Sequence, residues 1–444
     1  MLIRRNLEQL DREGKAIKLG IVGLGAMGAG TLSMLQSTAG IRCVAAADLD
    51  VQRLVSVFES IGYSREDLAI TDNTAAAEIA VAEGKPVLTD NGLMLSNLDI
   101  DVILEATGSA SFGARVAYEA ILNGKHIVML TVETDVLVGP ILARLAESAG
   151  VVYTLAAGDQ PGAILELYHW AKTLGLDVIA AGRGCFRFPE DRYQGPHEDR
   201  RGRSWVSENP KMANSFRDGT KAQIEMAAVS NATGLVPDIR GMHEPFAQVS
   251  QLSKVFRLKE HGGILNQTGV IEIANAVNDA GTWIKEDQVG DGVFLVIDSA
   301  NDTVQKYLHQ FFGRTSPRGG VLFRPYHMTC LEVPISIARA ALYGVETAKP
   351  CGLYTEVVAA AKRDLEVGQV LDGGGGSTVY SLVERATESR RGNFIPIGLT
   401  EGAKLKKAVS KDQILSFSDV EVEKDLFIDS LRNLQARTFL ETAP

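Results

Sequence analysis

The chain has 444 residues, too many for one typical hydrophobic core, so two or three domains are expected. Hydrophobic residues make up 45% and charged residues 23%, which excludes a disordered or fibrous chain. The formal net charge of -10 argues against nucleic acid or a membrane surface as a partner, because both attract basic patches. No stretch reaches membrane-spanning length, and four scattered cysteines without a CxxC favour reduced thiols in the cytoplasm.

The first 18 residues form a charged stretch with a few separated apolar positions, including Leu2, Leu7 and Leu10. This stretch lacks the continuous apolar core of a secretion signal. It predicts an N-terminal helix or arm that leads into the first strand.

A glycine-rich turn follows between a predicted strand and a predicted helix. Residues 16–22 are apolar and β-branched, Gly23-Leu24-Gly25-Ala26-Met27-Gly28 follows, and good helix formers continue to Gln36. Glycines let the backbone approach a pyrophosphate, whose charge meets the amides at the helix N-terminus. A GxGxxG alone is a weak signal, but this strand-turn-helix context predicts a dinucleotide-binding site.

The second strand, residues 41–47, ends at Asp48, about twenty residues past the glycines as the dinucleotide fold requires. Asp48 would hydrogen-bond the adenosine ribose, which favours NAD. Arg53 could instead pair with the 2′-phosphate of NADP. Both cofactors therefore stay open at this point.

Strands and helices keep alternating to the end of the first segment, which predicts parallel strands with crossover helices. The elements expected are a helix at 73–83, a strand at 102–106, a helix at 113–123, and strands at 126–130 and 152–156. We expect residues 1–150 to form a doubly wound Rossmann domain of the α/β class. Thr107 and Gly108 then end a strand beside the nicotinamide, whereas His126 is expected to be a packed strand residue. The expected cofactor-binding residues are Gly23, Gly25, Ala26, Met27, Gly28, Asp48, Arg53, Thr107 and Gly108.

Residues 151–350 are expected to form an α+β domain for catalysis and dimerisation, whose final helix, within 324–342, returns toward the first domain. Gly158-Asp159-Gln160-Pro161-Gly162 predicts a turn before a helix at 163–172. Asp159 could present a carboxylate to a substrate or metal, or it could simply form the turn. Residues 187–217 are rich in Pro and Gly, which predicts a loop over a site or a surface insertion.

Residues 218–229 are predicted to form a helix that carries three ionisable groups. Asp218, Lys221 and Glu225 stand at i, i+3 and i+7 and would share one face. Lys221 could donate to a carbonyl or hydroxyl oxygen, and Glu225 could hold a cation or shuttle a proton. The alternative is a solvated face with ordinary salt pairing. Asp159, Asp218, Lys221 and Glu225 are the catalytic candidates.

A phosphate-binding group is predicted from arginines near turns, because guanidinium forks suit phosphate oxygens. The substrate-binding candidates are Arg183, Asn231, Arg318, Arg324, Tyr326 and His327. Glu133 and Asp135 offer oxygen ligands at a sheet edge, but the sequence assigns no metal site.

After residue 351 the pattern changes to short strands and turns, at 373–376, 395–399 and 413–416. This pattern predicts a small β-rich domain over residues 351–444.

Several of these motifs resemble known families. The glycine turn, Val102-Ile103-Leu104-Glu105-Ala106-Thr107-Gly108 and Gly124-Lys125-His126-Ile127-Val128 resemble the Rossmann domain of homoserine dehydrogenases, loosely over the first 340 residues. Residues 129–135 depart from the Asn-Lys pair of that family, which argues against homoserine as the substrate. Residues 361–369, 395–399 and 412–415 resemble the SAF module, a small β-clip-like domain.

Over all three segments the chain resembles the 1-deoxy-D-xylulose 5-phosphate reductoisomerase-like family. That resemblance implies NADPH, a phosphorylated sugar as substrate, and commonly a divalent cation, Mg²⁺ or Mn²⁺. The implied reaction converts 1-deoxy-D-xylulose 5-phosphate to 2-C-methyl-D-erythritol 4-phosphate, in the methylerythritol phosphate pathway of isoprenoid precursor synthesis. The alternatives are an NAD(P)-dependent dehydrogenase of another small hydroxy or semialdehyde substrate, and a non-enzymatic cofactor-sensing protein. A homodimer is the default expectation for a dehydrogenase of this size.

Overall fold

The computed structural model describes residues 2–198, 209–312 and 318–440, so part of the expected loop at 187–217 lies outside the described residues. The chain divides into two compact units. The first unit comprises Met1–Gly162 with Met328–Lys349, and the second comprises Ala163–His327 with Pro350–Pro444. Residues 350–444 thus cluster with the central segment. No helix among the described residues is long and apolar enough to cross a bilayer.

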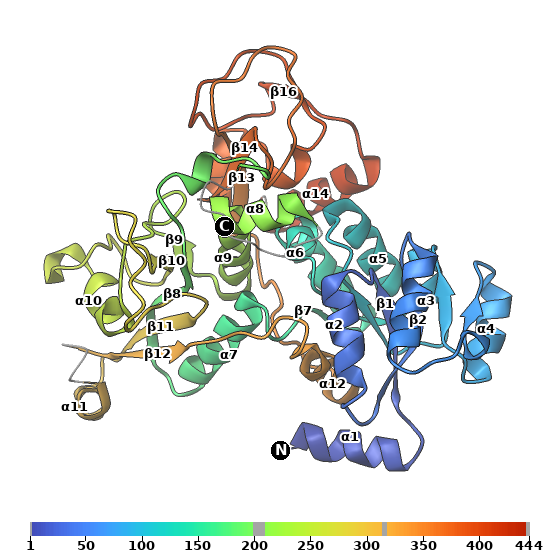
Figure 1. Cartoon of the computed structure of the whole chain (residues 1–444). Helices are drawn as coiled ribbons and strands as arrows, with labels where there is room; N and C mark the ends of the chain where they lie inside the picture. The colour runs from blue at the N-terminus through green and yellow to red at the C-terminus, as the bar shows by residue number, and fades with distance from the viewer. Residues whose placement is uncertain (1, 199–208, 313–317, 441–444) are drawn as a thin grey trace. The chain divides into compact units, whose positions relative to one another are not determined.

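The first unit is built on a seven-stranded parallel sheet with the order β3-β4-β2-β1-β5-β6-β7 (Figure 1, blue to teal). The strands are β1 (Ile17–Val22), β2 (Ile41–Ala47), β3 (Ala69–Ile70), β4 (Val87–Thr89), β5 (Val102–Glu105), β6 (His126–Met129) and β7 (Tyr153–Leu155). The helices are α1 (Leu2–Arg12), α2 (Ala26–Leu35), α3 (Val51–Ser60), α4 (Thr74–Ala82), α5 (Ala110–Leu122), α6 (Val132–Ala149) and α12 (Val333–Tyr343). The strand order steps outward in both directions from β1, as in a doubly wound dinucleotide-binding sheet. This confirms the predicted α/β fold class.

The strands of this sheet are nearly continuous apolar runs because helices cover both faces of a parallel sheet. Leu19 and Ile21 of β1 and Phe58 of α3 are completely buried in one core cluster. Ile337 of α12 joins the same cluster, so the helix predicted to return toward the first domain packs in the first unit.

Helix α7 (Gln160–Thr173) begins three residues before its expected start, so the predicted turn before it is shorter than expected and ends at Asp159. Pro161 suits the first turn of a helix because the amide that proline lacks has no intrahelical acceptor there. Asp159 is buried, and its Oδ1 accepts a hydrogen bond from the Gln160 amide at 3.0 Å.

The second unit contains a mixed five-stranded sheet with the order β12-β11-β8-β10-β9. Its strands are β8 (Asp177–Cys185), β9 (Val236–Pro237), β10 (Val270–Asn275), β11 (Val293–Asp298) and β12 (Gly320–Arg324). β10 is parallel to β8, whereas β11 is antiparallel to it. Phe256 and Phe294 stack at 5.4 Å between ring centroids in the core on this sheet.

The remaining elements of the second unit are mostly helices and a C-terminal β-hairpin. They are α8 (Pro210–Asp218), α9 (Thr220–Thr233), α10 (Leu252–Val255), α11 (Asp302–Phe312), β13 (Thr355–Ala361), β14 (Val379–Arg385), α13 (Ala386–Arg391), β15 (Lys404–Leu405), β16 (Val420–Glu421) and α14 (Leu426–Phe439). β13 and β14 pair in antiparallel fashion, and α9 packs against them.

The helix predicted at 218–229 is confirmed as α9 from Thr220 onward, but Gly219 separates Asp218 from it. Gly219 has a φ of 87°, a left-handed conformation that ends α8 at Asp218 and starts α9 at Thr220. Asp218 therefore does not share a helical face with Lys221 and Glu225.

Candidate functional site

In the glycine turn after β1, packing leaves no room for a side chain at Gly23 and Gly28, whereas Gly25 has room for one. Gly23 has a φ of 92°, and a Cβ there would lie 2.6 Å from the Ala106 carbonyl oxygen. A Cβ on Gly28 would lie 2.1 Å from the Gly23 carbonyl oxygen, whereas a Cβ on Gly25 would meet nothing within 4 Å. Glycine at 25 thus leaves open space beside the N-terminus of α2, where a dinucleotide diphosphate would lie.

The N-terminus of α2 can receive an anion. The helix begins at Ala26, with Met27 and Gly28 in its first turn, and that turn carries no acidic side chain. The first amides of a helix have no intrahelical acceptor, so they can donate to phosphate oxygens. These residues fit a nicotinamide dinucleotide.

Asp48 holds the glycine turn against the end of β2. Its Oδ2 accepts from the Leu24 amide at 2.8 Å, and its Oδ1 accepts from the Asp50 amide at 3.1 Å. Asp50, which sequence reasoning missed, caps α3 by accepting from the Arg53 amide at 3.0 Å. Asp48 therefore lies in the loop at the carboxyl end of β2, and Arg53 lies in the first turn of α3 that follows this loop.

A buried carboxylate fixes the Thr107–Gly108 turn at the end of β5. Glu105 is completely buried, and its Oε1 accepts from the Thr107 amide at 2.9 Å and from the Thr107 and Thr131 hydroxyls at 2.5 and 3.0 Å. The Gly108 amide donates to the Thr131 hydroxyl at 2.9 Å. Burial raises the pKa of Glu105. Sequence reasoning treated Glu105 only as a strand residue.

Asp135 was expected to offer an oxygen ligand at a sheet edge, but the structure buries it completely inside the first unit. Its Oδ1 accepts from the Tyr153 hydroxyl at 3.1 Å. Burial raises the pKa of Asp135 to about 7, because charge is costly where no water reaches it.

The structure places the predicted catalytic carboxylates in two separate buried ion pairs. Asp218 binds Lys362 at 2.7 Å, with both side chains fully buried, and Lys362 also donates to the Gln194 carbonyl at 2.8 Å. Glu225 pairs with Arg183. Lys221 is 7% exposed, on α9. Asp218 and Glu225 thus bind two different cations, Lys362 and Arg183.

Asn231 has a buried structural position at the end of α9. Its Oδ1 accepts from the amides of Tyr354 and Thr355 at 2.8 and 3.0 Å, which ties the start of β13 to the helix. Arg183, in β8, is also buried.

The other predicted substrate residues lie around β12: Arg318 precedes it, Arg324 is its last residue, and Tyr326 and His327 follow it. Arg318 pairs with Asp298 at 2.9 Å. Arg324 binds Glu166 at 3.1 Å and lies over the Tyr326 ring, 4.9 Å from its centroid. His327 Nδ1 lies 2.8 Å from the Asp291 carbonyl oxygen.

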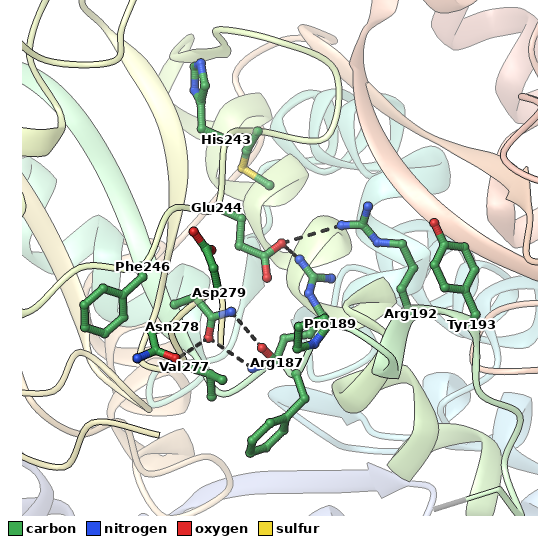
Figure 2. A pocket seen from close by; sticks show the side chains of 13 residues that line it. Arg187, Pro189, Arg192, Tyr193, His243, Glu244, Phe246, Val277, Asn278 and Asp279 are labelled. Atoms are coloured by element: carbon green, nitrogen blue, oxygen red, sulfur yellow. Dashed lines mark hydrogen bonds and ion pairs between the residues drawn. The ribbon is translucent and has the colours of Figure 1, made fainter. Parts of the chain in front are cut away.

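A cavity of about 360 Å³ opens at the carboxyl ends of β8 and β10. We call it the arginine cavity. Figure 2 shows Glu244 reaching toward the guanidinium groups of Arg187 and Arg192. Arg187 is 8% exposed and pairs with Glu244, and burial lowers the pKa of Arg187 to about 10. Arg192 is 32% exposed and lies 3.7 Å from Glu244 Oε2, so it is the more accessible of the two cations.

The backbone beside this cavity is in an unfavourable conformation. Met242 and Glu244 have φ values of 66° and 50°, a left-handed region that bulky side chains rarely adopt. Each such residue costs about 1–3 kcal/mol and persists only where its surroundings enforce it. Strain of this kind gathers at functional sites, so it marks Glu244 as a candidate functional residue.

Hydrogen bonds from His243 to Glu272 hold this turn in its unfavourable conformation. Its amide donates to Glu272 Oε2 at 3.0 Å, and its Nδ1 lies 2.6 Å from Glu272 Oε1. The hydrogen bond to Glu272 raises the pKa of His243. Figure 2 shows the His243 ring turned away from the two arginines, so His243 positions the turn that carries Glu244.

Sequence reasoning missed the arginine cavity, because its residues come from segments far apart in the chain. The available signal was the run Gly241-Met242-His243-Glu244-Pro245, which places two titratable residues between a glycine and a proline.

No three His, Cys, Asp or Glu side chains gather as a metal site would require, within residues 2–198, 209–312 and 318–440.

Residues 158–333, less than half of the chain, match the family model described as oxidoreductase DRL, catalytic domain. Among the curated proteins, none matches the sequence significantly. The arginine cavity is lined entirely by residues of the matched segment.

Several solved structures are similar to part of the chain at low identity. An oxidoreductase from Agrobacterium radiobacter in complex with NAD+, L-tartaric acid and magnesium is 13% identical, over 39% of this chain and 44% of that one, with a TM-score of 0.28. A DOX-P reductoisomerase in complex with NADPH, fosmidomycin and magnesium is 18% identical, over 47% of this chain and 57% of that one, with a TM-score of 0.34. A probable dehydrogenase from Thermotoga maritima is 12% identical, over 76% of this chain and 90% of that one, with a TM-score of 0.37. The chain thus spans about half the length of the first two, and likeness at this level carries no argument about the reaction.

The parallel sheet with its glycine turn and the matched catalytic domain together define the class of the protein. It is an oxidoreductase with a nicotinamide dinucleotide-binding fold.

Proposed function

We propose that the chain is an NADPH-dependent reductoisomerase that converts 1-deoxy-D-xylulose 5-phosphate to 2-C-methyl-D-erythritol 4-phosphate. The observation that carries the proposal is the arginine cavity, where a strained turn holds Glu244 beside Arg187 and Arg192. The match of residues 158–333 to an oxidoreductase catalytic domain supports it.

Arg192 is the proposed phosphate-binding residue. Its guanidinium is only loosely held by Glu244, at 3.7 Å, and is accessible from the cavity. A phosphate dianion would attract Arg192 more strongly than one carboxylate does, because guanidinium and phosphate form paired charge-assisted hydrogen bonds. Arg187 would stay with Glu244, since its main chain is also fixed by Asn275 at 3.1 and 2.8 Å.

Glu244 is the proposed proton carrier. Rearrangement of the ketose requires removal of a proton from the hydroxyl next to the carbonyl, migration of a carbon–carbon bond to the carbonyl carbon, and protonation of the former carbonyl oxygen. One carboxylate can take the first proton and return it to that oxygen, so atoms and charge balance. Arg187 pairs with Glu244 and so holds this carboxylate at the wall of the arginine cavity.

The first unit is the proposed cofactor-binding unit, with its diphosphate at the amides after Gly25. Bound NADPH supplies the hydride that reduces the aldehyde formed by the rearrangement. Thr107 and Gly108, which Glu105 fixes, would bound the nicotinamide end of this site.

The test is a spectrophotometric assay at 340 nm with purified protein, NADPH and 1-deoxy-D-xylulose 5-phosphate. We expect consumption of NADPH that depends on the sugar phosphate and forms the branched product in equal amounts. Consumption with other small semialdehydes or hydroxy acids, and none with the sugar phosphate, would establish the dehydrogenase alternative. Binding of NADPH without turnover of any of these substrates would favour a cofactor-sensing protein.

A further inference from the structure

A second cavity, of about 560 Å³, lies at the opposite end of the central sheet from the arginine cavity. It is lined by Ile179 near the start of β8 and by Thr268, which precedes β10. The arginine cavity is lined by Asn275, which pairs in register with Cys185 at the far end of β8. At about 3.3 Å per residue, the strand from 179 to 185 spans roughly 20 Å. A sugar phosphate cannot reach both cavities.

The second cavity contains an arginine side chain that lacks a partner. Arg257 lines the cavity, and its Nε is buried without a hydrogen-bond acceptor among the described residues. Burying a polar donor unpaired costs free energy, and a cationic one costs more. An anion that entered the cavity would remove this cost.

The loop that carries Arg257 is closely packed. The Arg257 carbonyl oxygen accepts from the Leu265 amide at 2.9 Å. A Cβ on Gly263 would lie 2.1 Å from that same oxygen, so glycine is required for this close approach. Arg257 is therefore held at the cavity wall by packing, without a carboxylate to bind it.

The other charges in this cavity leave it with a positive balance. Asp298 also lines it, but Arg318 neutralises that carboxylate at a distance of 2.9 Å. Ser253 and Thr268 add hydroxyl donors. His261 also lines the cavity, and the rest of the wall is apolar and is formed by Ile179, Phe256, Leu258, Val296 and Ile297. One wall thus suits an anionic group, and the other suits a hydrocarbon group.

We propose that this cavity is a second ligand site, which binds a small amphiphilic anion with its charged head at Arg257 and its hydrocarbon part on the apolar wall. Arg318, predicted above to bind the substrate, then belongs to this site and not to the arginine cavity. The inference does not depend on the proposed reaction, since it concerns binding at a separate place.

The test is isothermal titration calorimetry of the full chain with pentyl phosphate, with inorganic phosphate as the probe that lacks a tail. We expect saturable binding of pentyl phosphate that is tighter than that of inorganic phosphate. Arg257→Gln should raise the Kd of pentyl phosphate about tenfold or more, the effect of losing a charge-assisted hydrogen bond. The matched variant Arg192→Gln should weaken any separate binding at the arginine cavity and leave the Kd of the Arg257 site unchanged.

Hydrogen exchange of the unmutated chain gives a second measurement that does not depend on a variant folding. Pentyl phosphate should slow exchange of amides at 253–268, whatever its effect on the amides at 187–193. An unchanged Kd in Arg257→Gln, loss of the Arg257 site in Arg192→Gln, protection confined to 187–193, or no saturable binding would each overturn the proposal.

Discussion

Alanine at Gly25 should weaken cofactor binding, whereas alanine at Gly28 should lower the stability of the fold, although the two glycines belong to one motif. At Gly25 the backbone has φ −67° and ψ −166°, which alanine adopts freely, and no atom lies within 4 Å of the new methyl group. The lower entropy of the unfolded chain stabilises the variant by about 0.4–1 kcal/mol, and the weaker N-cap offsets a few tenths of this. The free energy of unfolding should therefore change by less than about 1 kcal/mol.

The methyl group at position 25 would, however, occupy the space left for the diphosphate. Losing one or more amide-to-phosphate hydrogen bonds weakens binding by about 1.5–3 kcal/mol, or roughly ten- to a hundredfold in Kd. At Gly28 the methyl group would lie 2.1 Å from the Gly23 carbonyl oxygen, a clash with backbone that cannot rotate away. Overpacking of this kind costs about 1–3 kcal/mol or more, which lowers the Tm by several degrees.

The assay combines thermal unfolding followed by circular dichroism with calorimetric titration of NADPH and NADH. Gly25→Ala should melt like the unmutated chain and lose cofactor affinity, whereas Gly28→Ala should melt earlier. The reasoning is refuted if Gly25→Ala binds both nucleotides with unchanged affinity, or if it loses as much stability as Gly28→Ala.

Four further outcomes follow from the contacts described above. Arg192→Gln should raise the KM for the sugar phosphate about tenfold or more and change kcat less, as steady-state kinetics would show. Glu244→Gln should lower kcat by about 10²–10⁴-fold while the Kd of NADPH stays the same in calorimetry, and equal turnover would remove Glu244 from the chemistry. The pKa of His243 is raised in the folded chain, so the protonated ring stabilises the fold fully below the pKa that His243 has in the unfolded chain. This stabilisation is lost as the pH rises through the pKa of the folded state. Denaturant melts at increasing pH should show this loss for the unmutated chain and not for His243→Gln. Burial raises the pKa of Asp135 to about 7, so the folded chain binds this proton more tightly than the unfolded chain does. The free energy of unfolding should therefore fall as the pH rises from about 4 to 7. Asp135→Asn should flatten this part of the curve of stability against pH.

Most strands and several helices of the first unit could be predicted because local signals and the fold agree there, whereas α3, α6, β3 and β4 were not predicted. The apolar strand before Gly23, the three glycines and the acid after β2 each reflect interactions within a short stretch of chain. The break at Gly219 was missed because a glycine between good helix formers is compatible with both a continuous helix and a left-handed cap. Local sequence cannot decide between them.

The arrangement of side chains in the second unit could not be predicted, because it depends on residues far apart in sequence. Asp218 pairs with Lys362, and Glu225 of α9 pairs with Arg183 of β8. Helical spacing correctly places Lys221 and Glu225 on one helix, but it does not reveal which cations the sheet brings to the carboxylates. Glu244 and Arg192 meet only after β8 and β10 have paired.

The central claim is that a hydride passes from bound NADPH to the carbon that the rearrangement turns into an aldehyde. It is tested most directly with NADPH in which both hydrogens at C4 of the nicotinamide are replaced by deuterium. The product is then analysed by mass spectrometry and NMR. We predict one deuterium per molecule of 2-C-methyl-D-erythritol 4-phosphate, at that carbon and in a single stereochemical configuration. Product without deuterium, or deuterium at another carbon, would contradict the account.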